Sequence, residues 1–266
     1  MDLITQSREG DVVTLTLTAP TMTPEFFAAC EATFTALAGD ASLRAVVVRS
    51  SAKAFSYGLD LPKAMAAYGP VMTGGGLAPR RAELHTLIRQ LQRSFTAIAT
   101  CPVPVVAAVH GACIGGGVDL IAACDVRVAS ADAKFSVRET KIAIVADLGS
   151  LQRLPAIIGP AHTRELALTG KDIDAARAER IGLVTQVAAD RDGAWAAAQA
   201  VAAEIAANPP LTVRGVKQVL EYSTGKSVDD GLAYVASWNA AFLASEDLVE
   251  AATAFAQKRP PKFTGR

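Results

Sequence analysis

The spacing of apolar residues divides the chain into a part where strands and helices alternate and a part that is helical throughout. Short β-branched runs predict strands, and apolar residues three and four apart predict helices. The predicted strands are residues 12–18, 43–49, 103–109, 125–129 and 182–187. The predicted helices between them are residues 24–38, 80–100, 116–123, 150–158, 161–169 and 174–181. Strands that recur with helices between them indicate an α/β fold.

The last quarter of the chain, residues 192–258, has only helical spacing, with breaks near Asn208, Gly225 and Ser245. We therefore predict a core region over residues 1–190 and a C-terminal helical region over residues 191–266. The helical region is rich in alanine and other apolar residues, which fits packing on a partner subunit or on its own core.

Residues 65–79 contain Gly69-Pro70 and three successive glycines at 74–76. Glycine and proline are the strongest signals for loops. No Lys-Ser/Thr pair follows the glycines, so a phosphate cradle is not expected. The prediction is a mobile surface loop.

Composition narrows the class of protein. Of the 266 residues, 51% are hydrophobic and 20% charged, which allows a sizeable core. Lys+Arg and Asp+Glu both number 26, so the chain lacks the basic excess of a nucleic-acid binder. The four cysteines form no C-x-x-C pair and the three histidines are scattered, so no zinc site is expected. No signal-peptide pattern and no apolar stretch of membrane-spanning length is present, so we expect a cytoplasmic protein.

The centre of the chain carries a glycine-rich helix start. The apolar run of residues 105–109 leads through His110-Gly111 to Gly115, Gly116 and Gly117. Glycines there let another molecule approach the bare backbone. A helix start also presents unpaired N–H groups and a partial positive charge, which suit a phosphate or a developing oxyanion. The alternative is a helix start packed on a strand with nothing bound.

Two loops that follow predicted strands each offer a main-chain N–H beside a glycine. These loops are residues 54–61 and 110–117, and the two N–H groups belong to Leu59 and Gly116. Two donors aimed at one point form an oxyanion hole, which suits a thioester carbonyl that becomes an enolate. The alternative is two ordinary connections between strand and helix.

Three acids follow in or near apolar segments: Asp119, Glu139 and Asp147. Carboxylates in an apolar pocket have raised pKa values, and like charges nearby raise one of them further. Such a pair can exchange protons near neutral pH. Taken singly, each acid also fits a solvated loop or a structural ion pair, as Asp125 and Arg127 do.

A serine hydrolase is disfavoured because the chain has no G-x-S-x-G motif. A pairing of Ser56 with His110 is conceivable, but His110 fits better as a strand end with a satisfied imidazole. His85 and His162 fall in predicted helices.

Three motifs carry a family resemblance. AFSYGLDL (residues 54–61), AAVHGACIGGGVDLIAACDVRVAS (107–130) and FSVRETKIAIVADLGSLQRLPAIIG (135–159) occur in this order. With them, nearly the whole chain resembles the crotonase, or enoyl-CoA hydratase/isomerase, family. The resemblance implies a spiral of ββα units and a helical C-terminal region that forms homotrimers, often paired into hexamers. It also implies an acyl-CoA thioester as substrate, with coenzyme A part of the substrate and no separate cofactor or metal.

The resemblance assigns residues to the substrate. Leu59 and Gly116 match the oxyanion donors, Ala54 and Ser56 match the edge of the adenine pocket, and a tail segment with Lys258 and Lys262 looks like one that reaches a neighbour's coenzyme A. The expected substrate contacts are Ala54, Ser56, Tyr57, Gly58, Leu59, Asp60, Leu61 and Gly116. Tyr57 departs from the smaller residue common in the family, and we expect it to narrow the pocket.

The acids sort the family by reaction. Hydratases have two glutamates at the positions of Asp119 and Glu139, with a glycine-rich turn at residues 145–147. This chain instead is similar to the Δ3,5-Δ2,4-dienoyl-CoA isomerases, which carry Asp, Glu and Asp. That implies Glu139 at C2 of the substrate, Asp147 at C6, and Asp119 tuning or orienting them. The alternatives are an enoyl-CoA hydratase that uses Asp119 and Glu139 with water, and a non-catalytic acyl-CoA-binding oligomer.

Overall fold

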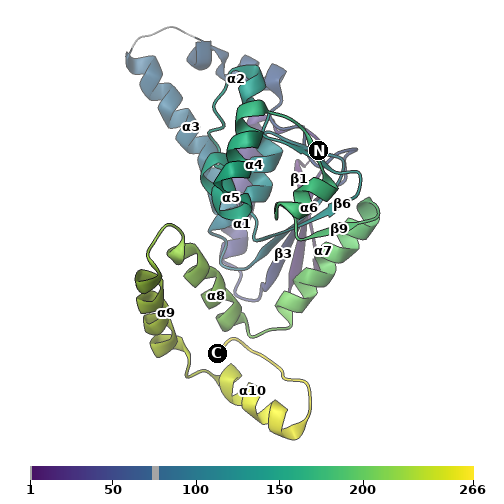
Figure 1. The fold of residues 1–266 in the computed structure, drawn as a ribbon. Helices are drawn as coiled ribbons and strands as arrows, with labels where there is room; N and C mark the ends of the chain where they lie inside the picture. The colour runs from purple at the N-terminus through teal and green to yellow at the C-terminus, as the bar shows by residue number, and fades with distance from the viewer. Residues whose placement is uncertain (1, 74–77) are drawn as a thin grey trace.

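The computed structural model describes residues 2–73 and 78–266 (Figure 1). Its main sheet has six strands in the order β1-β2-β3-β4-β6-β9. These strands are β1 (Ile4–Glu9), β2 (Val12–Leu17), β3 (Ala45–Ser50), β4 (Val105–Val109), β6 (Val126–Ser130) and β9 (Gln186–Ala188). Among the described strands of this sheet, only the β1–β2 pair is antiparallel. Four predicted strands are present within two residues of their predicted bounds, whereas the strand predicted at residues 182–187 is present only as β9 at 186–188. β1 adds an exposed edge strand that the polar sequence ITQSRE did not signal.

A second, smaller sheet joins β5 (Ala112–Ile114), β7 (Lys134–Ser136) and β8 (Ile173–Asp174). These strands are two or three residues long, too short for an alternating pattern to reveal. Each long strand β4 and β6 is thus followed by a short strand. The helix α4 (Gly116–Ala122) follows β5, and the short 3₁₀ helix η1 (Glu139–Ile142) follows β7. The repeat of strand, strand and helix is the ββα unit that the resemblance implies.

Helices cover both faces of the main sheet. One face packs against α1 (Pro24–Ala38), α3 (Ala78–Ala99), α4 and α5 (Ser150–Thr169) in a single apolar core. The other face is covered by α7 (Arg191–Ala206), seen beside β9 in Figure 1. The buried residues of α7 are all alanines, at positions 194, 198 and 202, which let the helix lie close to the valines of the sheet. A further short helix is α6 (Ala175–Arg180).

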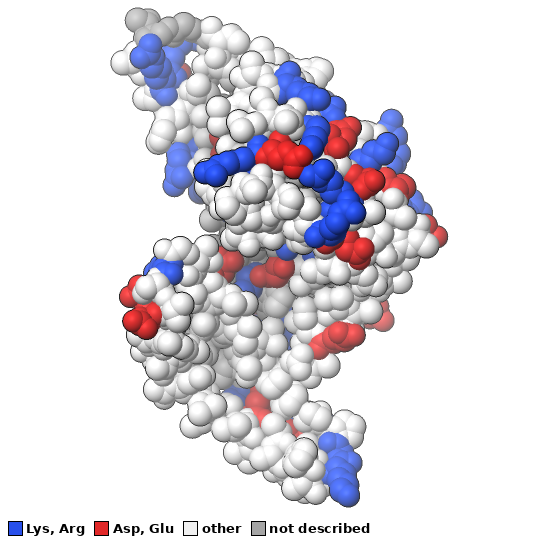
Figure 2. All heavy atoms as spheres, viewed as in Figure 1, with Lys and Arg blue, Asp and Glu red and all other residues white. Residues whose placement is uncertain are grey.

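The helices at the C-terminal end of the chain extend away from the sheet (Figure 1). They are α8 (Pro210–Ser223), α9 (Val228–Phe242) and α10 (Glu246–Gln257), and their breaks fall where the sequence predicts them. None of the residues of α9 is buried, and Phe255 of α10 is 88% exposed. On the face that Figure 2 shows, few charged side chains lie over these helices, whereas charges gather on the core. The boundary at residue 190 stays a prediction, and α7 packs on the core.

One predicted loop is wrong over most of its length. Instead of a loop at residues 65–79, the chain forms α2 (Leu61–Thr73), and α3 begins at Ala78. The three glycines at 74–76 lie outside the described residues. Pro70 is accommodated inside α2, and Gly69 and Ala64 are its buried residues. Packing of this small-residue face therefore overrides the loop signal of Gly69-Pro70.

The two helices predicted at residues 150–158 and 161–169 are present as the two halves of α5. They are separated by Gly159, whose backbone is not helical. Among the residues that the structure describes, no helix is both long enough and apolar enough to span a bilayer. The same residues contain no group of three or more His, Cys, Asp or Glu placed to hold a metal ion.

Candidate active site

The two predicted donor loops run side by side. Between them, the N–H of Ser56 donates to the carbonyl of Ala112 and the N–H of Ile114 donates to the carbonyl of Ser56, both at 2.9 Å. These bonds form a parallel bridge between Ser56 and Cys113. Residues 54–61 after β3 and residues 110–117 after β4 are therefore fixed to each other, although more than fifty residues separate them.

At Gly58 the two loops approach each other closely. Its φ of +81° is a conformation that residues with a Cβ rarely adopt. A Cβ on Gly58 would lie 2.8 Å from the carbonyl oxygen of Ile114 and 3.2 Å from the nitrogen of Gly116. Glycine is therefore required here, and the residue after it, Leu59, is brought next to the start of α4.

Met22 holds the first loop from the other side. Its N–H donates to the carbonyl of Gly58 at 2.8 Å, and its carbonyl accepts from the N–H of Asp60 at 2.9 Å. This pairing leaves the N–H of Leu59 directed away from Met22. Within the described parts of the chain, no protein group accepts from the Leu59 N–H. The N–H of Gly116 begins a helix, where no intrahelical acceptor precedes it. Two unpaired donors therefore lie close together at the predicted position.

Asp119 lies in the first turn of α4 and is only 1% exposed. One carboxylate oxygen, Oδ1, accepts a hydrogen bond at 2.6 Å from the N–H of Ser150, the first residue of α5. Burial, and then the nearby charge of Glu139, raise the pKa of Asp119 to about 7. This carboxyl can therefore hold or release a proton near neutral pH.

Glu139 begins η1 and lies over Gly115, one residue before the Gly116 donor. Its Oε1 is 3.1 Å from the place that a Cβ on Gly115 would occupy. Its Oε2 is buried and has no hydrogen-bond partner among the described residues. Burial, and then the charge of Asp147, raise the pKa of Glu139. A partly desolvated carboxylate with a free oxygen is suited to take a proton from a bound molecule.

Asp147 lies in an irregular segment between η1 and α5 and is half-buried. Burial raises its pKa, and its charge in turn raises the pKa values of Glu139 and Asp119. The side-chain amide of Gln92 on α3 donates to the main-chain carbonyl of Asp147 at 2.6 Å. The three predicted acids therefore share one site beside the two donors. The Ser150 N–H and Gln92 belong to the same site, and the sequence pattern pointed to neither.

The other predicted substrate contacts differ in exposure. Ala54 and Ser56 are buried, and the Oγ of Ser56 accepts from the N–H of Gly58 at 3.0 Å, so both support the loop from inside. Tyr57 is 43% exposed, with Lys53 Nζ 5.7 Å from the centre of its ring. Asp60 accepts from the N–H of Lys63, in the first turn of α2, at 3.1 Å. Leu61 is exposed.

Lys258 and Lys262 lie at and beyond the end of α10, in the region that extends away from the sheet (Figure 1). Lys258 ends the helix in a left-handed conformation, and the N–H of Lys262 donates to Glu250. Within one chain, the structure does not bring these lysines to the three acids.

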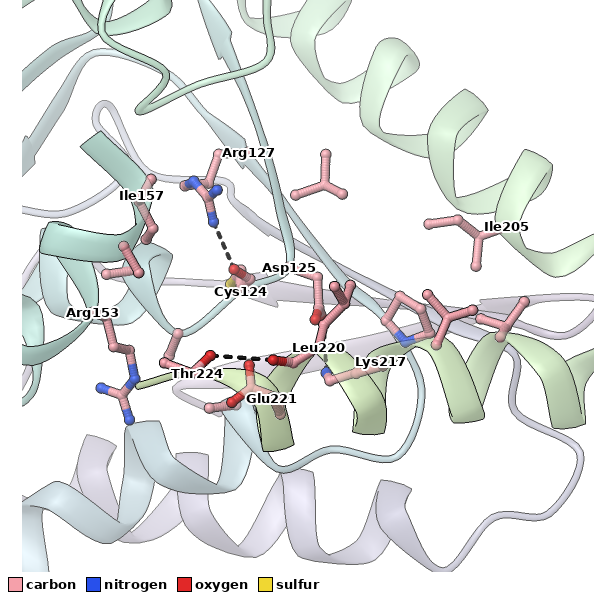
Figure 3. Close-up of a pocket in the computed structure, with 18 of the residues that line it drawn as sticks. Cys124, Asp125, Arg127, Arg153, Ile157, Ile205, Lys217, Leu220, Glu221 and Thr224 are labelled. Atoms are coloured by element: carbon pink, nitrogen blue, oxygen red, sulfur yellow. Dashed lines mark hydrogen bonds and ion pairs between the residues drawn. The ribbon is translucent and has the colours of Figure 1, made fainter. Parts of the chain in front are cut away.

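Asp125 and Arg127, which the sequence predicts to be structural, are both hydrogen-bonded within the fold. Asp125 accepts from Lys217 Nζ and from the N–H of Val105, both at 2.7 Å. Arg127 donates to the carbonyls of Leu183 and Cys124 at 2.7 and 2.6 Å. Asp125 and Arg127 line a cavity of about 790 Å³ between the core and α8 (Figure 3). Asp125 and Arg127 are thus satisfied separately rather than by each other.

His110 is buried at the end of β4, and its Nε2 bonds to the carbonyl of Ala52 at 3.0 Å. In the described structure its Nδ1 has no partner. The predicted satisfied imidazole therefore holds for one ring nitrogen only.

Comparison with known proteins identifies the family. The family model described as enoyl-CoA hydratase/isomerase matches residues 7–266. The chain belongs to this family. It is 47% identical over 227 residues to a protein of Dictyostelium discoideum named mitochondrial Delta(3,5)-Delta(2,4)-dienoyl-CoA isomerase, covering 84% of this chain and 76% of that one. It is 38% identical to the peroxisomal Delta(3,5)-Delta(2,4)-dienoyl-CoA isomerase of Arabidopsis thaliana, covering 99% of this chain and 96% of that one.

Solved structures of family members have the same fold. An enoyl-CoA hydratase from Bacillus anthracis superposes with a TM-score of 0.89 at 26% identity, over all of both chains. A putative enoyl-CoA hydratase from Streptomyces coelicolor A3(2) superposes with a TM-score of 0.90 at 29% identity, over 100% of this chain and 95% of that one. The predicted crotonase-type α/β fold is confirmed, and as a family member the chain is an enzyme.

Proposed function

We propose that this enzyme is an acyl-CoA isomerase that converts a 3,5-dienoyl-CoA into a 2,4-dienoyl-CoA. The observation that carries the proposal is the third acid. Asp147 is half-buried, and its charge acts on Glu139 and Asp119 beside the two unpaired donors. The names of the relatives from Dictyostelium discoideum and Arabidopsis thaliana support the same reaction.

The reaction removes one proton from C2 of the substrate and adds one proton to C6. Glu139 takes the proton from C2, and the electron pair of that C–H bond forms the C1–C2 double bond of an extended enolate, in which the C3–C4 and C5–C6 double bonds remain. The negative charge rests on the thioester oxygen, between the N–H groups of Leu59 and Gly116. Protonated Asp147 then gives its proton to C6, which takes up the electron pair of the C5–C6 double bond. The charge leaves the oxygen as the C1 carbonyl re-forms, and the double bonds become C2–C3 and C4–C5.

Burial and mutual repulsion prepare the acids for these opposite tasks. All three carboxyls have raised pKa values, because of burial first and, for Asp119 and Glu139, like charge second. Acids that share a site do not all ionise together, so one can be a base while another keeps its proton. Asp119, held by the Ser150 N–H, has the role of tuning this balance.

The test follows conversion of 3,5-octadienoyl-CoA by ultraviolet absorbance. Wild type should turn the substrate over, and Asp147→Asn should lower kcat by roughly 10²- to 10⁴-fold, because it removes the acid that serves C6. Asp229→Asn is the matched control, since Asp229 is exposed on α9. A fully active Asp147→Asn enzyme would refute the two-acid relay.

A second candidate is an enoyl-CoA hydratase in which Asp119 and Glu139 position water. The coupling of these two acids favours it, and the solved relatives named above carry that name. Aspartate is one methylene shorter than glutamate, so water would be held less well. Rapid hydration of crotonyl-CoA, with no conversion of the dienoyl thioester, would select this function. Tight coenzyme A binding with no turnover of either substrate would instead indicate a non-catalytic acyl-CoA binder.

The C-terminal helical region, residues 191–266, is proposed to join the chains into a homotrimer or a hexamer of two trimers. Its support is the apolar side chains left exposed on α9 and α10, among them Leu232, Val249 and Phe255. Lys258 and Lys262, remote from the acids of their own chain, would then be free to reach a neighbour's coenzyme A. Sedimentation equilibrium measures the assembly. Cytoplasmic location also stays a prediction, because the named relatives are mitochondrial or peroxisomal.

A further inference from the structure

The main chain that carries Asp147 has little regular structure to hold it. Residues 144–147 belong to neither a helix nor a strand. The segment leaves η1 through a bond from the N–H of Ile144 to the carbonyl of Glu139 at 3.1 Å. It then reaches α5, where Arg153 makes a long contact of 3.4 Å with the carbonyl of Leu148. Its neighbours Ala146 and Leu148 pack on the apolar core, and apart from that packing the placement of Asp147 depends on a few side-chain hydrogen bonds.

The shortest of these contacts comes from α3. The Nε2 of Gln92 donates to the carbonyl of Asp147 at 2.6 Å across 55 positions of sequence. This bond fixes the main chain of the acid itself, not its carboxylate. The carboxylate therefore stays free for the substrate while its Cα is held.

Gln92 is itself fixed in orientation. Arg89, one turn earlier on α3, donates from Nη1 to the Oε1 of Gln92 at 2.8 Å. Because a guanidinium can only donate, the oxygen of the Gln92 amide must face Arg89, and the nitrogen is left to face Asp147. The helix beneath is anchored by the buried side chains of Phe95 and Ile98. A rigid helix with an oriented amide is a suitable support for an irregular loop.

We propose that Gln92 is a positioning residue that holds Asp147 within reach of the far carbon of the substrate. The inference rests on the proposed isomerase function, because only that reaction needs an acid at C6. Proton removal at C2 belongs to Glu139, and in the described structure the side-chain hydrogen bonds of Gln92 go to Arg89 and Asp147 instead. A misplacement near 1 Å costs up to about 100-fold in rate, so the loss of this bond should slow delivery to C6 and spare removal at C2.

The experiment compares Gln92→Met with Gln90→Met. Methionine keeps the length of the side chain and removes the donor, and Gln90 is an exposed glutamine on the same helix. Three quantities are measured: kcat for 3,5-octadienoyl-CoA, washout of the C2 proton into D2O, and hydrogen–deuterium exchange of a peptide spanning residues 143–149. For Gln92→Met we expect kcat about 10- to 100-fold lower, C2 washout within about twofold of wild type, and faster amide exchange. Gln90→Met should match wild type in all three.

The outcomes separate this inference from the function on which it rests. If wild type exchanges the C2 proton but never forms the 2,4-diene, the proposed function is wrong, and unchanged amide exchange in Gln92→Met would independently overturn the positioning contact. If wild type isomerises and Gln92→Met is equally fast, or loses C2 washout to the same extent as isomerisation, Gln92 does not position Asp147 specifically.

Discussion

The carboxylate of Asp119 accepts a hydrogen bond at 2.6 Å from the main-chain N–H of Ser150. The bond joins α4, the helix that follows the second donor loop, to the N-terminus of α5. A helix N-terminus favours a negative charge. Even so, burial and the charge of Glu139 dominate and raise the pKa of Asp119 to about 7. The fold therefore holds a carboxyl whose charged form it disfavours.

This conflict predicts a pH-dependent gain in stability for Asp119→Asn. The ordinary pKa of an unfolded aspartate is about 4, so between about pH 4 and 7 the folded state binds more protons than the unfolded state. Folding stability of wild type must then fall as pH rises through that window. The variant has no such group and keeps an oxygen for the Ser150 N–H. The free energy of unfolding is measured with urea at pH 5 and pH 8. The difference between Asp119→Asn and wild type should shift in favour of the variant by on the order of 2 kcal/mol between the two pH values.

The control for Asp119→Asn is Asp229→Asn, which changes an exposed aspartate on α9. The difference in unfolding free energy between Asp229→Asn and wild type should be the same at pH 5 and pH 8. An Asp119→Asn difference that is the same at pH 5 and pH 8 would contradict the raised pKa.

Gly58→Ala should impair catalysis because it forces the two donor loops apart. The new Cβ would lie 2.8 Å from the carbonyl oxygen of Ile114 and 3.2 Å from the Gly116 nitrogen, so the loops must shift. Loss of a well-placed oxyanion donor costs about 10²- to 10³-fold in kcat, and this is the expected effect on isomerisation.

A matched control for Gly58→Ala exists at Gly225. It also has a positive φ, +71°, but nothing lies within 4 Å of the place that a Cβ would occupy there. Gly225→Ala therefore imposes the backbone strain without the close approach. If both variants keep the wild-type kcat, the spacing of the donors does not limit the reaction.

The sequence predicts the large elements of the fold because their signals are local. Val46 to Val48 form a continuous apolar run that becomes the buried centre of β3, and Pro24 and Gly39 mark the ends of α1 correctly. Strands of two or three residues, such as β5, carry no readable period. In α2, packing overrides the loop signal of Gly69-Pro70, and neither neighbours nor burial can be read from a local pattern.

The candidate site also contains residues that the sequence predicts and groups that it does not. Glycines before a helix and acids in apolar segments nominate Gly116, Asp119, Glu139 and Asp147 from the sequence. The groups that hold them are set by tertiary contact. The Ser150 N–H reaches Asp119 across 31 positions and Gln92 reaches Asp147 across 55. A main-chain N–H has no residue signature, and a helical glutamine is ordinary on a helix surface, so neither could be found before the fold was known.

The C-terminal helices are joined to the core by a partly buried ion pair whose loss should destabilise the protein. Lys217 on α8 is 7% exposed, and its Nζ donates to the carboxylate of Asp125 at 2.7 Å (Figure 3). Asp125 lies in the segment between α4 and β6. Removing one member of a fully buried pair costs about 3–5 kcal/mol. The Asp125 side chain is 25% exposed and keeps its bond from the Val105 N–H, so Lys217→Met should cost less than that. Adding Asp125→Asn removes the stranded charge, so the double variant should regain part of that loss. Urea unfolding at pH 7 measures the cycle, with Lys134→Met as a control at an exposed lysine. A double variant less stable than the sum of the two single losses would show that the pair acts through packing and not through charge.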